Sequence, residues 1–170
     1  VTDFGLDTLI NQNTSLFFAG QWGDFDNDGF EDLFIPNLTK SKHLLFRNDG
    51  GIDFNQVPVN PEFSVSGRNI TWADYNNDGL LDYFAPLYVN DISGPVNPAA
   101  IFKNLGNSSF QKIPIDVFES PAGTWGDTDN DGDLDLVANG YSDNGNGGVH
   151  YLSLFRNDGN DQFTKLFLPY

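Results

Sequence analysis

Short apolar segments alternate with turns rich in Gly, Asn, Asp and Pro along the whole chain. An apolar period of 3.6 residues is nowhere sustained, so the pattern predicts β-strands and no helices. The segments also recur in a fixed order. WGDFDNDGFEDLF at 22, WADYNNDGLLDYF at 72 and WGDTDNDGDLDLV at 125 align without a gap. One sequence unit therefore occurs three times.

The segments downstream of this motif recur as well. LFRNDG at 45, IFKNLG at 101 and LFRNDG at 154 are followed by FNQVPV at 54, FQKIPI at 110 and FTKLFL at 163. Each unit thus holds four short strands separated by turns, which is typical of an antiparallel meander. Four strands in about 50 residues predict an all-β fold of propeller-type blades, with a β-solenoid as the weaker alternative.

The predicted boundaries divide one structural domain into three repeats, at 14–65, 66–118 and 119–170. The segment DFGLDTLI at 3–10 is left over. Its Phe4 precedes Trp22 by the same interval that separates Phe54 from Trp72. We therefore expect residues 1–13 to hold an extra N-terminal strand, the outer strand of a preceding or neighbouring blade.

Each repeat contains a nine-residue acidic loop, at 24–32, 74–82 and 127–135, here numbered from position 1 to 9. Side-chain oxygens at positions 1, 3, 5 and 9 can surround one centre, Gly at position 6 permits a positive φ, and the backbone carbonyl at position 7 adds a ligand. Such oxygen ligands suit Ca²⁺, and we expect about three ions, one per repeat. The predicted ligands are Asp24, Asp26, Asp28, Phe30 and Asp32; Asp74, Asn76, Asp78, Leu80 and Asp82; and Asp127, Asp129, Asp131, Asp133 and Asp135.

The alternative for these loops is an Asn- and Asp-rich hairpin turn that binds nothing. Three copies with the same acidic spacing favour calcium, because unscreened carboxylates this close would raise each other's pKa and push the loop apart. The middle loop has Asn76 where the others have a carboxylate, so we expect it to bind more weakly.

Charge narrows the class of partner. The chain of 170 residues has 24 acidic and 8 basic residues, a net charge of −16, which disfavours nucleic acid and anionic membranes. It has no cysteine and no apolar run long enough to cross a bilayer. It begins at Val1, as a processed or excised product would. N-glycosylation sequons at Asn13, Asn37, Asn69 and Asn107 permit an extracellular glycoprotein.

The D-x-D/N-x-D-G-x-x-D loop in units of about fifty residues resembles the FG-GAP/VCBS repeats of integrin α-chain propellers, bacterial surface proteins and some fungal lectins. The resemblance implies a β-propeller with one calcium loop per blade, generally in extracellular proteins of adhesion or recognition. Three repeats are too few to close the ring that this family usually forms.

Several recurring residues have two interpretations. Trp22, Trp72 and Trp125 could stack on sugars, but their shared register favours packing between blades. For Arg47, Lys103 and Arg156 we expect rim charges that balance nearby Asp. His43 and His150 are expected at the surface of strands. The longer loops at 90–100 and 142–150 are the candidate region for a small ligand, although tolerated insertion is the favoured explanation of their length.

The predicted function is therefore non-catalytic. The acidic clusters are copies of one loop, whereas glycosidase chemistry needs two carboxyl groups in unlike environments. We expect an extracellular or cell-surface calcium-binding protein of structure or adhesion. Its open ends would be completed by neighbouring copies, in a filament or ring, or by further blades. The alternative is a segment of a lectin-like propeller with a glycan or protein ligand; a polysaccharide-active enzyme module is less favoured.

Overall fold

The computed structural model describes residues 20–36, 43–51, 53–58, 69–86, 99–117, 122–142 and 148–168. These residues form β-strands and turns without a helix, as the pattern predicts, and none of them forms a helix that could span a membrane. The extra strand expected at 3–10, the sequons at Asn13 and Asn37, and most of the two longer loops lie outside the described residues.

Three four-stranded antiparallel sheets make up the fold, and each lies within one predicted repeat. The strands of each sheet follow one another along the chain, so each sheet is a meander, here called blade 1, 2 or 3. Blade 1 consists of β1 (Gln21–Gly23), β2 (Asp32–Ile35), β3 (Leu44–Asp49) and β4 (Asp53–Val57). Blade 2 consists of β5 (Thr71–Ala73), β6 (Asp82–Ala85), β7 (Ala100–Asn104) and β8 (Phe110–Pro114). Blade 3 consists of β9 (Gly123–Gly126), β10 (Asp135–Ser142), β11 (Val149–Asn157) and β12 (Phe163–Phe167).

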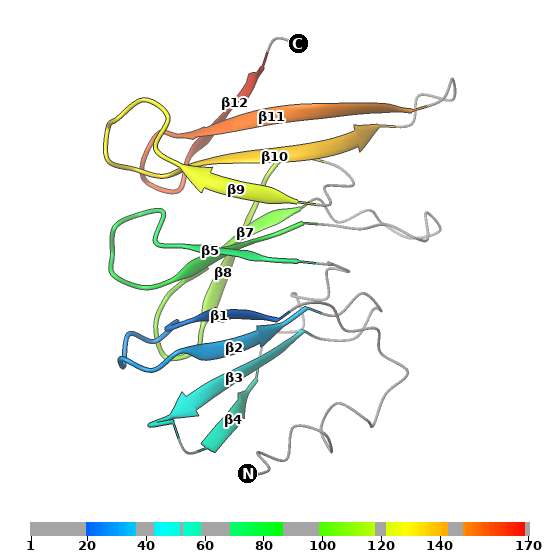
Figure 1. Ribbon diagram of the computed structural model, residues 1–170. Helices are drawn as coiled ribbons and strands as arrows, with labels where there is room; N and C mark the ends of the chain where they lie inside the picture. The colour runs from blue at the N-terminus through cyan, green and yellow to red at the C-terminus, as the bar shows by residue number, and fades with distance from the viewer. Residues whose placement is uncertain are drawn as a thin grey trace.

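The blades stack face to face in sequence order, and the three acidic loops lie along one side of the stack (Figure 1). Within the described residues the stack is open, because blades 1 and 3 each have a face without a neighbouring blade. This arrangement confirms the propeller-type blades expected from the sequence; the three blades do not close into a ring.

The hydrophobic core lies between the blades. Strand pairing places Phe34, Leu45 and Val57 on one face of blade 1, here called the front face, which points toward blade 2. The ring of Phe34 meets Trp72 edge-on at 5.7 Å and lies 5.1 Å from the ring of Tyr83, both on the back face of blade 2. Because side chains alternate along a strand, every blade has a front and a back face of this kind.

The junction between blades 2 and 3 repeats this packing with different residues. Tyr75, at position 2 of its loop, stacks on Trp125 with ring centroids 5.8 Å apart, and the Trp125 indole N–H donates to the carbonyl of Thr71 at 3.2 Å. Trp72 and Trp125 thus pack between blades, as expected from their shared register. Trp22 does not: its side chain is 58% exposed.

The prediction for His43 is wrong. This residue precedes β3 and is only 1% exposed, with its ring 5.4 Å from that of Phe34. It follows the alternation of Leu45 and so lies on the front face of blade 1, which blade 2 covers. His150, on β11, is exposed as expected.

Candidate metal-binding loops

The backbone of the three acidic loops is nearly identical. Two residues in each loop have a positive φ, the Gly at position 6 and the Asn at position 4. Their φ angles are 92° at Gly29, 86° at Gly79, 98° at Gly132, 57° at Asn27, 56° at Asn77 and 60° at Asn130. The glycines were predicted to bend in this way. The asparagines were missed, although Asn at position 4 in all three repeats is a sequence signal for the left-handed conformation.

The first Asp of each loop holds the turn together. In loop 1, Asp24 accepts hydrogen bonds from the N–H groups of Asp28 at 3.0 Å and Gly29 at 2.8 Å. Asp74 accepts the same two bonds in loop 2, at 3.0 and 2.9 Å, and Asp127 accepts the one from Gly132 at 3.2 Å. Local side-chain bonds of this kind fix the loop before any ligand binds.

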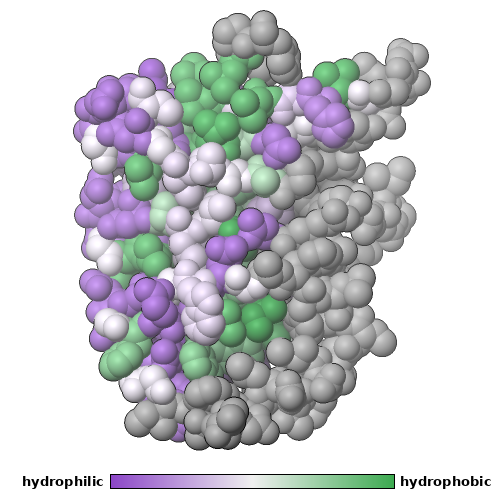
Figure 2. Space-filling model, in the orientation of Figure 1, coloured by the Kyte–Doolittle hydropathy of each residue, from purple (hydrophilic) through white to green (hydrophobic). Residues whose placement is uncertain are grey.

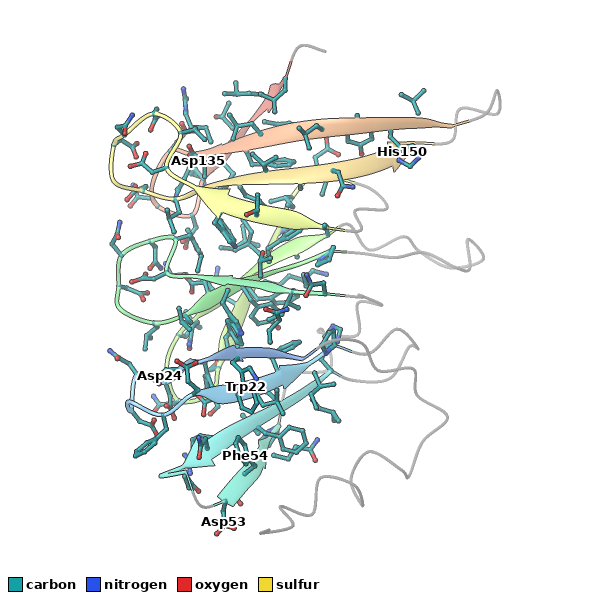
Figure 3. The ribbon with its side chains drawn as sticks, in the orientation of Figure 1. Trp22, Asp24, Asp53, Phe54, Asp135 and His150 are labelled. Carbon is teal, nitrogen blue, oxygen red and sulfur yellow. The ribbon has the colours of Figure 1, made fainter. Side chains whose placement is uncertain are left out.

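Positions 1, 3 and 5 converge on one point. Carboxylate oxygens of Asp24, Asp26 and Asp28 lie within 4.8 Å of one another (Asp24 is labelled in Figure 3), and those of Asp127, Asp129 and Asp131 do the same. Burial and the nearby charges of Asp28 and Asp24 raise the pKa of Asp26. A cation at the convergence point would relieve this repulsion.

The Asp side chains at position 9 are more deeply buried than those at positions 1, 3 and 5. Asp32, Asp82 and Asp135 are at most 1% exposed, although each begins a strand. Asp32 accepts hydrogen bonds from the N–H of Phe25 at 3.0 Å and from that of Asn48 at 2.8 Å, and so joins its loop to β3. Each carboxylate oxygen has a second lone pair, so ligation of a metal by position 9 stays a prediction.

The position 9 carboxyls differ in acidity. Burial raises the pKa of Asp32 to about 6 and that of Asp82 to about 7. Burial acts on Asp135 in the same direction, but hydrogen bonds from the Thr128 hydroxyl and from the Asn157 N–H outweigh it, and the pKa of Asp135 is lowered. The other loops lack this bond at position 2, because Phe25 has no hydroxyl and the Tyr75 hydroxyl donates to Asp161 instead.

A buried oxygen indicates that a cation fits loop 1. Within the described residues, Asp26 Oδ1 is buried and has no hydrogen-bond partner. A buried carboxylate oxygen without a partner is costly, and Ca²⁺ is bound by oxygens of this kind. The donor set of loop 2 is less charged, because its position 3 is Asn76, whose amide donates to Asp78 at 2.9 Å.

The other predicted residues are placed as follows. Arg47 and Arg156 form exposed ion pairs with Asp49 and Asp158, both at 2.7 Å, which confirms them as rim charges. Lys103 instead links two blades, since its ammonium group pairs with Asp161 of blade 3 at 2.9 Å. Among the sequons, Asn69 accepts a hydrogen bond from Gln21 at 3.1 Å, and Asn107 is exposed in a turn with a φ of 50°.

Sequence reasoning missed one recurring position, occupied by Asn104 and Asn157, that links the loops to the blades. The side-chain amide of Asn104 donates to the carbonyl of Phe25, in the loop of the preceding blade, at 2.7 Å. Asn157 donates to the carbonyl of Tyr75 at 2.9 Å in the same way. The recurring Asn of the RNDG and KNLG segments was the available signal. Its partner could not be read from the sequence, because it is a backbone atom of another repeat.

The comparison with protein families agrees with this geometry. Residues 9–85 match the family model described as an FG-GAP-like repeat. This part of the chain is therefore similar to an FG-GAP-like repeat. The match includes loops 1 and 2, and loop 3 repeats their hydrogen bonds outside the matched residues. No curated protein matches the chain. The family supports a β-propeller-type repeat domain, as the stacked blades do.

Proposed function

We propose that this protein is a non-catalytic, extracellular calcium-binding repeat protein that acts in structure and adhesion. The observation that carries the proposal is the acidic loop repeated three times, with the same hydrogen bond from the position 6 Gly to the first Asp and with carboxylates that converge in loops 1 and 3. About three Ca²⁺ ions, one per loop, would hold the side-chain oxygens at positions 1, 3 and 5 together. They would thereby fix the loops against the blade junctions, where Asn104 and Asn157 bind the loop carbonyls.

Several observations support a non-catalytic role. The converging carboxylates occur in copies of one loop, and the most strongly perturbed Asp, Asp82, is wholly buried. A general acid must reach its substrate, which Asp82 does not do from this position. The resemblance to FG-GAP-like repeats supports an extracellular location.

Thermal unfolding with and without calcium tests this function. A ligand at 100 times its Kd stabilises the folded state by about 2.7 kcal/mol per site, and each kcal/mol raises Tm by about 2–4 °C for a chain of this size. Calcium should therefore raise Tm by about 5 °C or more above the value in chelator. Asp24→Asn should reduce this rise, whereas Asp53→Asn, on the exposed start of β4 (Figure 3), should leave it unchanged. A Tm unaffected by chelator would contradict the proposal.

A lectin-like function is the second candidate, and the exposure of Trp22 favours it. An exposed indole is a suitable surface for stacking on a sugar ring. Titration with neutral oligosaccharides, followed by tryptophan fluorescence, would support this function if the signal saturates in wild-type protein and not in Trp22→Ala. No change with any sugar would leave structure and adhesion as the function.

A further inference from the structure

Blade 3 has an apolar front face that neither of the other two described blades covers. In blades 1 and 2 the front-face positions are at most 9% exposed: Phe34, His43, Leu45 and Val57, and Phe84, Ala99, Ile101 and Ile113. The same positions of blade 3 are Val137, Leu152, Leu154 and Leu166, of which Leu152 is 39% and Leu166 is 37% exposed. Figure 2 shows apolar atoms gathered at this end of the stack, over β11 and β12.

The junctions between blades 1 and 2 and between blades 2 and 3 show which groups pack against a front face. Each front face packs against the back face of the next blade, which contributes a Trp from its first strand, Trp72 or Trp125. Each back face also contributes an Asn, Asn104 or Asn157, whose amide donates to the carbonyl at position 2 of the preceding loop. Covering the front face of blade 3 in this way needs an exposed Trp and a matching Asn.

Blade 1 carries that pair of groups on its free back face. Trp22 lies at the register of Trp72 and Trp125, but within the described residues no other blade packs on it, and its ring meets that of Phe54 edge-on at 6.1 Å (Figure 3). Asn48, at the register of Asn104 and Asn157, donates to Glu31 of its own blade at 3.0 Å. The described stack of three blades thus presents one half of a blade junction on each of its two outer faces.

We propose that the front face of blade 3 docks on the back face of blade 1 of a second copy of this chain. Trp22 of one copy packs on Leu154 and Leu166 of the other, as Trp72 packs on Phe34 of blade 1. Asn48 donates to the carbonyl of Thr128, and the Trp22 indole N–H donates to the carbonyl of Thr124, the counterpart of Thr71. The contact is heterologous, so copies add head to tail and form a filament or a closed ring.

This inference rests on the proposed function in one respect. The acidic loops of adjacent blades touch, since Asn77 donates to the carbonyl of Gly132 at 3.0 Å and to Asp133 at 3.1 Å. Docking therefore brings loop 3 of one copy against loop 1 of the next. Calcium neutralises both loops, so association should be stronger with calcium than with chelator.

Variants that alter only one of the two docking faces, here called single-sided variants, test the arrangement by sedimentation velocity in millimolar calcium. Trp22→Glu disables the back face, and Leu152→Glu combined with Leu166→Glu disables the front face; Thr124→Arg is a second front-face variant. Leu105→Glu, in the turn after β7, adds a charge at a residue that is 52% exposed and lies on neither face. We expect the wild type and Leu105→Glu to form concentration-dependent assemblies, and each single-sided variant to associate at least about tenfold more weakly.

Mixing the two kinds of variant gives the decisive result. A 1:1 mixture of Trp22→Glu with either front-face variant has one intact junction. It should therefore form a dimer of twice the 18.8 kDa chain mass and nothing larger. A wild type that stays monomeric, a mixture without dimers, or single-sided variants that assemble like the wild type would each overturn the inference.

Calcium titration of the same samples separates this inference from the proposed function. Wild-type protein that binds calcium but stays monomeric would overturn the head-to-tail contact and leave the calcium-binding function in place. Protein that binds no calcium would overturn the proposed function whether or not it assembles. Intact calcium binding in each variant also shows that the variant is folded.

Discussion

The side-chain amide of Asn104 donates to the backbone carbonyl of Phe25, a residue 79 positions earlier in the chain. The bond is buried, and it ties β7 of blade 2 to the acidic loop of blade 1. Asn157 and Tyr75 repeat the relationship one blade later. The acidic loops and the blade junctions are therefore joined by hydrogen bonds, and a substitution in one should change the stability of the other.

Asn104→Ala should lower the free energy of unfolding by about 1–3 kcal/mol, because it leaves the buried Phe25 carbonyl without a donor. Asn48→Ala is the matched control. Asn48 makes the equivalent bonds within its own blade, to the Glu31 carbonyl and from the Gly51 N–H, but its side chain bonds to no other blade within the described residues. Urea unfolding of both variants measures the difference, and equal losses would show that the inter-blade bond contributes nothing.

Asn76→Asp should strengthen calcium binding by loop 2. It adds the carboxylate that loops 1 and 3 have at position 3, and ligand charge is a main determinant of calcium affinity. We expect the weakest of the calcium affinities to rise by about tenfold in isothermal titration calorimetry. Asn77→Asp adds the same charge at position 4, outside the predicted ligands, and should not reproduce the gain. Three equal affinities in the wild type would contradict the expected weakness of loop 2.

Asp161 links blades 2 and 3 and should make their junction sensitive to acid. Partial burial acts to raise its pKa, but hydrogen bonds from the Tyr75 hydroxyl at 2.7 Å and from Lys103 at 2.9 Å outweigh this, and the pKa is lowered from 3.8. A carboxyl with a lowered folded-state pKa binds fewer protons when folded. Its stabilising contribution is therefore present above about pH 4 and is lost as the pH falls through the folded-state pKa.

Asp161→Asn should thus cost about 1 kcal/mol of stability at pH 7 and less at pH 3, as measured by urea unfolding at both pH values. Asp158→Asn changes an ion pair that is exposed to solvent, with Arg156, and should have the smaller effect at pH 7. If the loss caused by Asp161→Asn were the same at both pH values, the charge of Asp161 would not be the cause.

Much of the fold and of the site could be predicted from the sequence, because both are encoded locally. Strand order follows from alternation and turns within each repeat, and the loop follows from Asp24, Gly29 and their counterparts at fixed spacing. The burial of His43 and the exposure of Trp22 were not predictable in the same way. Each depends on whether another blade covers that face, and this is set by the position of the repeat in the stack rather than by the residues around it.

Thr128→Tyr should strengthen association between copies. At position 2 of its loop, Tyr75 stacks on Trp125 of the next blade, whereas blade 3 has the smaller Thr128 opposite the predicted place of the neighbouring Trp22. An aromatic pair adds about 0.5–1.5 kcal/mol, so the dissociation constant should fall by up to about tenfold in sedimentation velocity. Combining Thr128→Tyr with Trp22→Ala should abolish the gain, since the ring would have no partner.

The number of calcium ions bound per chain tests the central claim most directly. Equilibrium dialysis against calcium at near-physiological salt, with the bound metal counted by atomic emission, should give about three ions per chain, and about two when Asp24 and Asp26 are both changed to Asn. Wild-type protein that retains no calcium in this measurement would contradict the account, because the three loops would then be hairpin turns without a metal.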